Sequence, residues 1–129
     1  MPLRLSLIDD DRTTLFLVER LLKQNFPDAE VACFDCPIKA FEDIHRSGAD
    51  AVITDHGMGP MTGTELIQQL RAENVRIPMV MISNNPGAAT EAIAAGADDF
   101  VDKGEINRLP EIIGRMLRES RTTKIVETE

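Results

Sequence analysis

The stretch "AVIT", residues 51–54, is apolar on both faces of any strand that it could form, and "MVMI", residues 79–82, repeats this pattern. A strand with one solvated face alternates apolar and polar residues. A strand of a parallel sheet is covered by helices on both sides and therefore reads as a continuous apolar run. The two runs predict buried central strands of a parallel sheet.

The rest of the chain alternates short apolar runs with amphipathic stretches. The predicted strands cover 3–8, 30–34, 51–54, 78–82 and 99–102, and the predicted helices lie near 12–25, 37–47, 62–73, 87–95 and 108–120. Because crossovers between parallel strands are almost always right-handed, this order predicts an α/β fold. Its architecture is a doubly wound, five-stranded parallel sheet with helices on both faces, a three-layer sandwich.

The length of 129 residues corresponds to one domain, which we place at 1–121, followed by a polar C-terminal tail or linker stub at 122–129. With 22 acidic against 14 basic residues, the formal charge is −8, which disfavours direct nucleic-acid binding by this domain. The sequence has no signal-peptide pattern and no apolar window long enough to span a membrane. We therefore expect a cytoplasmic protein that does not contact the membrane.

The two cysteines, Cys33 and Cys36 in "CFDC", have the spacing of a redox dithiol. We favour ordinary packing, with Cys33 inside a strand and Cys36 at the start of the next helix. No further cysteine is present, and His45 and His56 are far apart in sequence, so a structural zinc site is not supported.

Polar side chains follow four of the five predicted strands. The first strand leads into Asp9 and Asp10, the third into Asp55, the fourth into Ser83 and the fifth into Lys103. In open α/β sheets, ligands bind outside the carboxyl ends of the strands. We therefore expect these side chains to meet at one edge of the sheet.

This set of groups suits phosphoryl chemistry with a divalent cation. Mg²⁺ binds carboxylates, carbonyl oxygens, waters and phosphate oxygens, and an aspartate can serve as a covalent phosphoryl acceptor. A lysine and a hydroxyl can stabilise the charge of the transferred group. Asp11 follows the pair directly, and we interpret it as a cap of the helix near 12–25.

Four motifs in this order and spacing resemble those of the receiver domain of two-component response regulators: "LIDDD" at 7–11, "DAVITDHGMGPMTG" at 50–63, "IPMVMIS" at 77–83 and "GADDFVDK" at 96–103. The resemblance covers about residues 3–120. It implies the flavodoxin-like strand order 2-1-3-4-5, which the chemotaxis response regulator exemplifies.

The resemblance also implies a role for each matching position. Asp55 would accept a phosphoryl group from a sensor histidine kinase or a histidine phosphotransfer protein. Ser83 and Lys103 would contact phosphoryl oxygens, and Ser83 and Phe100 would form the conformational switch. The implied Mg²⁺ ligands are Asp9, Asp10, Asp55 and the backbone carbonyl of Gly57.

The implied function is regulation rather than enzymatic turnover, apart from self-catalysed phosphorylation and dephosphorylation. Phosphorylation would shift the face formed by the fourth helix, the fifth strand and the fifth helix. The output would pass to an effector domain, to a downstream protein or to a phosphorylation-dependent dimer.

Several positions differ from the family's usual pattern. Gly104 stands where proline usually follows the lysine through a cis peptide, so we predict a trans bond after Lys103. The order Met58-Gly59-Pro60 predicts an altered loop after Asp55. Because Gly57 has no side chain, we expect Asn84 to set the rate of phosphoryl hydrolysis.

Two alternatives remain open. "DDDRT", residues 9–13, also fits haloacid-dehalogenase-like phosphohydrolases, with Asp9 as nucleophile and Asp11 as acid, but that family has no use for Asp55. A degenerate receiver that binds partners without phosphorylation is the other alternative.

We interpret His56 as a loop histidine. The small-residue segment 87–97 fits a partner surface and an ordinary helix equally well.

Overall fold

The computed structural model describes residues 2–57 and 59–128, with side chains as far as Ser120. The strands are β1 (Arg4–Ile8), β2 (Glu30–Phe34), β3 (Ala51–Asp55), β4 (Met79–Ser83) and β5 (Asp99–Asp102). The helices are α1 (Arg12–Asn25), α2 (Pro37–Ser47), α3 (Gly63–Ala72), α4 (Ala88–Ala95) and α5 (Leu109–Thr128), and a 3₁₀ helix, η1, covers Lys103–Arg108. The parallel strands pair in the order β2-β1-β3-β4-β5, which confirms the predicted fold.

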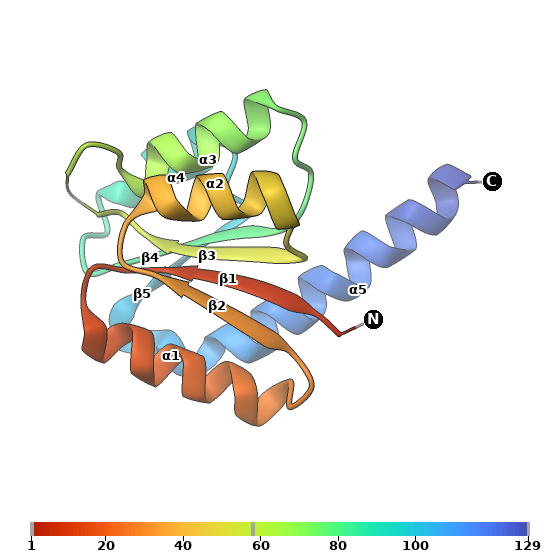
Figure 1. The fold of residues 1–129 in the computed structure, drawn as a ribbon, viewed down its shortest axis with the longest axis horizontal. Coiled ribbons are helices and arrows are strands. Elements are labelled where there is room, and N and C mark those ends of the chain that lie inside the picture. Colours follow the sequence, from red (N-terminus) through yellow and green to blue (C-terminus); the bar gives the residue numbers. More distant parts are fainter. Residues whose placement is uncertain (1, 58, 129) are drawn as a thin grey trace.

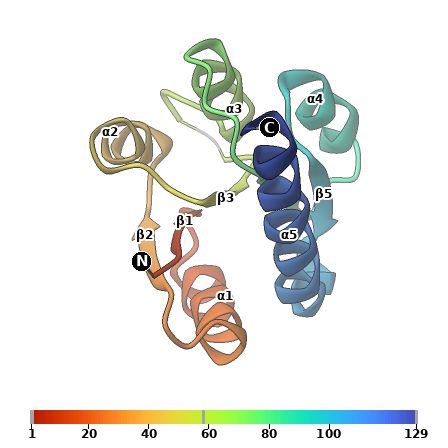
Figure 2. The ribbon, with the colours of Figure 1, turned by 90° about the vertical axis from the view of Figure 1, so that its right-hand side faces the viewer.

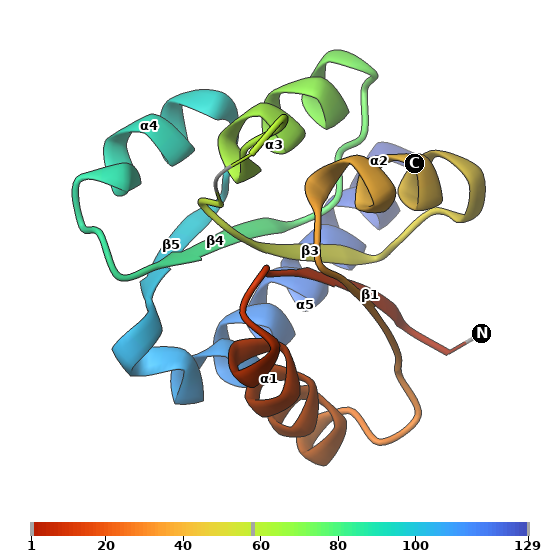
Figure 3. The same cartoon turned by 60° about the vertical axis from the view of Figure 1, so that its left-hand side comes forward.

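Helices cover both faces of the sheet (Figure 1). α1 and α5 lie on one face, and α2, α3 and α4 lie on the other, as the turned views in Figures 2 and 3 also show. Successive strand residues alternate between the two layers: Ala51 and Ile53 pack in the α1/α5 core, whereas Val52 packs in the α2–α4 core. Residues 51–54 are buried on both faces because each face has its own helical layer.

The element boundaries differ from the prediction mainly at the carboxyl ends. β3 and β4 each run one residue further than predicted, so Asp55 and Ser83 are the last residues of their strands. α5 continues to Thr128 instead of ending near residue 120, because no glycine or proline follows Gly114 to end the helix. The division between a domain at 1–121 and a tail at 122–129 stays a prediction.

The amino-terminal edge of the sheet holds two arginine clusters. Arg71 of α3 donates to the carbonyl oxygens of Gly96, Val75 and Ile77 at 2.9–3.0 Å and pairs with Asp98 at 2.9 Å. On the other side of the same edge, Arg4 of β1 forms an ion pair with Asp43 at 2.8 Å and donates to the Gly48 carbonyl. These contacts fasten the ends of α2 and α3 to the starts of the strands.

No helix in the described part of the chain is both long and apolar enough to cross a membrane.

Candidate functional site

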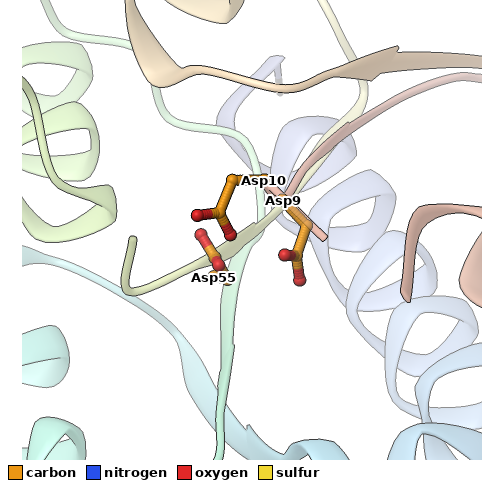
Figure 4. A group of neighbouring side chains, drawn as sticks. All are labelled: Asp9, Asp10 and Asp55. Atoms are coloured by element: carbon orange, nitrogen blue, oxygen red, sulfur yellow. The ribbon is translucent and has the colours of Figure 1, made fainter. Parts of the chain in front are cut away.

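Three carboxylates meet at the carboxyl end of the sheet (Figure 4). β1 and β3 are neighbours, with Ile8 opposite Thr54, so the residues that follow them come together. One carboxylate oxygen from each of Asp9, Asp10 and Asp55 lies within 4.8 Å of the others. Asp9 is fully buried and Asp55 is 7% exposed, whereas Asp10 is exposed.

Lys103 is the cation that faces this cluster. It begins η1 directly after β5, and its Nζ lies 2.9 Å from Asp9 Oδ2 and 3.6 Å from Asp55 Oδ2. Burial alone would lower the pKa of Lys103, but the contacts with Asp9 and Asp55 raise it above its usual value. Lys103 therefore stays charged and stabilises two of the three carboxylates.

A single lysine does not balance three carboxylates. Burial, followed by the repulsion of Asp9, raises the pKa of Asp55 from 3.8 to about 7. The site therefore disfavours an ionised Asp55 until additional positive charge arrives. Carboxylate oxygens at this separation suit a hard cation such as Mg²⁺. The Gly57 carbonyl stays a predicted further ligand.

Asp11 has a different environment from its two neighbours. It is the N-cap of α1, where its carboxylate accepts hydrogen bonds from the Thr13 N–H at 3.0 Å and the Thr14 hydroxyl at 3.0 Å. These bonds lower the pKa of Asp11. Its own N–H donates to Asp9 Oδ1, which fixes the orientation of the buried carboxylate. The prediction that Asp11 is a cap is confirmed.

Two glycines shape the loop between β3 and α3. Gly57 adopts φ +67°, and a Cβ there would lie 3.2 Å from Asp55 Oδ1, so a side chain would be strained and crowd the Asp55 carboxylate. Gly63 donates its N–H to the His56 carbonyl at 2.7 Å, and a Cβ at Gly63 would overlap the Asp55 carbonyl. This loop can pass close to Asp55 only because both positions lack a side chain.

Ser83 and Phe100 lie on the adjacent strands β4 and β5. Ser83 is 6% exposed, and its Oγ accepts a hydrogen bond from the Asn85 N–H at 3.0 Å, which leaves the hydroxyl proton available to another acceptor. Phe100 is partly buried and packs against the α2–α4 core. Ser83 ends β4 beside the strand that Asp55 ends, and Phe100 lies opposite Met81, two residues before Ser83.

The peptide bond after Lys103 is trans, as predicted, since the described residues contain no cis peptide bond. The Asp102 carboxylate accepts the Gly104 N–H at 2.7 Å and forms the turn that directs Lys103 toward Asp9. The sequence analysis did not select Asp102. Its Asp-x-Gly spacing is typical of such a turn and is the signal that could have identified it.

The sequence analysis also considered two cysteines and a loop histidine. Cys36 is the N-cap of α2, as expected, but Cys33 is exposed on the edge strand, so the expectation of ordinary packing is wrong for it. The residue is exposed overall, but partial burial of its sulfur, followed by the nearby Glu19, raises the pKa of Cys33 to about 11, which keeps the thiol protonated. His56 Nε2 lies 3.5 Å from Glu91 of α4, a contact that sequence spacing could not predict.

Buried carboxylates and a lysine at the carboxyl edge of the parallel sheet place the chain among α/β domains with a charged site at the strand ends. The family model of the response regulator receiver domain matches residues 5–114. The chain belongs to this family and is a receiver domain of two-component response regulators. The matches give no support to the haloacid-dehalogenase alternative.

Known relatives show the same family. The chain is 31% identical over 119 residues to the response regulator MprA of Mycobacterium sp. strain KMS, covering 90% of this chain and 50% of MprA. It is 31% identical over 99 residues to the response regulator protein TodT of Pseudomonas putida, covering 75% of this chain and 43% of TodT. The crystal structure of NtrX from Brucella abortus superposes with a TM-score of 0.87 at 25% identity, covering 99% of this chain and 29% of NtrX. The chain spans from 17% to 55% of the length of the curated relatives that it matches.

Proposed function

We propose that Asp55 is the phosphoryl acceptor of this receiver domain and that Asp9 and Asp10 hold the Mg²⁺ that phosphorylation requires. The observation that carries this proposal is the convergence of Asp55 with Asp9, Asp10 and Lys103, although these residues come from three separate strand ends. Asp55 is nine-tenths buried at the end of β3, where Lys103 faces one of its carboxylate oxygens.

In the proposed reaction, a carboxylate oxygen of Asp55 attacks the phosphorus of a phosphohistidine. The P–N bond breaks, and the imidazole leaves as its nitrogen takes up a proton. Lys103, 3.6 Å from Asp55 Oδ2, neutralises charge on the transferred group, and the Ser83 hydroxyl donates to one of its oxygens. Mg²⁺, when bound, supplies the positive charge that lets Asp55 ionise.

The proposed switch begins at Ser83. Ser83 would donate its free hydroxyl proton to the phosphoryl group, and its movement would be passed to the segment before α4 through the hydrogen bond that it accepts from the Asn85 N–H. Phe100 would then move against the α2–α4 core, and the face formed by α4, β5 and α5 would change its population of states. This face would signal to an effector domain, a downstream protein or a second copy of the domain.

Further parts of the proposal follow from the family. The donor is a sensor histidine kinase or a histidine phosphotransfer protein, the domain comprises residues 1–121, and it acts in the cytoplasm. It is a regulatory acceptor rather than an enzyme with turnover. The acidic charge of −8 agrees with a domain that does not bind nucleic acid directly.

The test is to incubate the protein with acetyl phosphate and Mg²⁺ and to map the adduct by mass spectrometry. We expect one phosphoryl group on Asp55 and none in the Asp55→Asn variant, while the Asp11→Asn control keeps full labelling. Labelling at Asp9, or turnover of many phosphomonoesters per protein, would instead support the phosphohydrolase. No uptake of phosphoryl or beryllium fluoride would support the degenerate receiver.

The hydrolysis rate gives a second test of the site. Asn84 is exposed directly after Ser83, and Gly57 has no side chain to shield the phosphoryl group. We therefore propose that Asn84 controls the approach of water, so Asn84→Ala changes the dephosphorylation rate several-fold. An unchanged decay of the Asp55 adduct in Asn84→Ala would refute this role.

A further inference from the structure

A cavity of about 240 Å³ opens beside the carboxylate cluster, between the ends of β1 and β3 and the start of α2. Its apolar wall is made of Ile8, Pro37, Ile38, Pro60 and Met61. Its volume is at the small end of ligand pockets and suits a compact organic molecule rather than a nucleotide. The receiver function proposed above makes no use of this wall.

The charges that border the cavity all have the same sign. Asp10, Asp35 and Asp55 line it, together with Cys36 and Gly57, and no basic residue does. Lys39 pairs with Asp35 at 3.3 Å, but both side chains are at least 60% exposed, so this pair is screened by solvent. The cavity therefore combines an apolar wall with a negative potential.

Two of these carboxylates lack a partner on the cavity side. Asp55 is 7% exposed, and among the described residues its Oδ1 has no ion-pair partner, since Lys103 approaches Oδ2. Asp10 likewise takes part in no ion pair within the described part of the chain, because Lys103 contacts Asp9 instead. A buried carboxylate oxygen that faces an apolar cavity favours a cationic ligand.

We propose that this cavity binds a small organic cation with an apolar body, such as an aromatic amine or amidine, and that this ligand and Mg²⁺ exclude each other. The apolar body packs on Ile38 and Met61, and the cation lies beside the Asp10 carboxylate and Asp55 Oδ1, which lack an ion-pair partner among the described residues. The exposed Asp35 adds negative charge to the same cavity. The exclusion rests on the proposed role of Asp10 and Asp55 as Mg²⁺ ligands, because the same carboxylates border both sites. By linkage, each ligand weakens the other by the same factor.

The experiment uses benzamidine as the probe and benzoate as a ligand of similar shape and opposite charge. Amide shifts of the ¹⁵N-labelled protein are followed with and without saturating Mg²⁺. We expect benzamidine to shift Ile38 and Met61 with a Kd on the order of 1 mM, ordinary for a fragment of this size, and Mg²⁺ to raise that Kd at least several-fold. We expect benzoate to leave the same amides unchanged.

Variants identify the two parts of the cavity. Asp35→Asn and Ile38→Ser should each weaken benzamidine several-fold without changing the Kd for Mg²⁺. The matched control is Ile93→Ser: Ile93 on α4 is 50% exposed against 39% for Ile38 but does not line the cavity. This control should leave benzamidine binding unchanged.

Several results would overturn the proposal. Equal binding of benzoate would show that the cavity does not select for positive charge. A benzamidine Kd independent of Mg²⁺ would show that the two ligands do not exclude each other. Tighter binding of Nα-acetyl-arginine amide than of benzamidine would identify the occupant as a partner's arginine side chain. Labelling of Asp55 by acetyl phosphate, measured without benzamidine, separates any of these failures from a failure of the receiver function.

Discussion

The two edges of the sheet differ in how their charged side chains are paired. At the amino-terminal edge, Arg71 donates to three backbone carbonyls and pairs with Asp98. At the carboxyl-terminal edge, three carboxylates lie together, and Lys103 is the cation that pairs with two of them among the described residues, while the pKa of Asp55 rises to about 7. Charge is balanced where the fold needs only stability. Negative charge is left without a partner where a cationic ligand can bind. Such locally unfavourable electrostatics are typical of functional sites.

The largest effect is expected at the balanced edge. Arg71→Met removes three carbonyl contacts and the partner of Asp98, so it should lower the free energy of unfolding by about 3 kcal/mol in urea titrations followed by circular dichroism. The control is Arg46→Met, whose side chain is 74% exposed in its pair with Asp43 and should change stability by less than about 0.5 kcal/mol. Equal losses in the two variants would mean that the Arg71 contacts stabilise the fold no more than an exposed ion pair does.

At the carboxyl-terminal edge, removal of a charge should raise the free energy of unfolding instead of lowering it. Because the pKa of Asp55 rises from 3.8 to about 7 on folding, the folded state binds more protons between these values, and its stability falls as pH rises through them. Asp55→Asn lacks this loss and should raise the free energy of unfolding by about 2 kcal/mol at pH 8 without Mg²⁺. The gain should shrink toward pH 4. A gain that is the same at both pH values would contradict the ionisation of Asp55 as its cause.

Mg²⁺ should stabilise the carboxyl-terminal edge by supplying the positive charge that the carboxylate cluster lacks. At ten times its Kd and at pH 8, the ion should raise the free energy of unfolding by about 1.4 kcal/mol, measured by thermal unfolding at constant ionic strength. Asp10→Asn removes one exposed ligand of the cluster and should abolish most of this gain. If the gain survived in Asp10→Asn, the ion would be bound elsewhere.

The smallest effect separates Asp11 from its neighbours. Asp11→Ala removes the α1 cap and should cost about 1 kcal/mol of stability while leaving the Mg²⁺ affinity unchanged. Asp10→Ala is the matched change one residue earlier. It should weaken the Mg²⁺ affinity without this loss of stability. Titration of both variants with Mg²⁺ and with urea checks this, and a weakened Mg²⁺ affinity in Asp11→Ala would place Asp11 in the metal site.

Much of the fold could be predicted from the sequence because its signals are local. Continuous apolar runs such as 51–54 indicated central strands, and an aspartate before residues 12–25 indicated a capped helix. The convergence of Asp55 with Lys103 was also predictable, since parallel strands bring their carboxyl ends to one edge. The exposure of Cys33 was not predicted, because the implied strand order places β2 at an edge but does not say how completely the helices cover its side chains.

The sequence by itself determined the alternation of strands and helices, the polar residues at the strand ends and the family resemblance, since each depends on local pattern and spacing. Only the tertiary structure decided how the charges at the site are shared. Lys103 pairs with Asp9 and with one oxygen of Asp55, Asp10 stays exposed, and a cavity opens beside them. These features depend on distances between segments far apart in the chain and on the burial that sets each pKa, neither of which residue spacing contains.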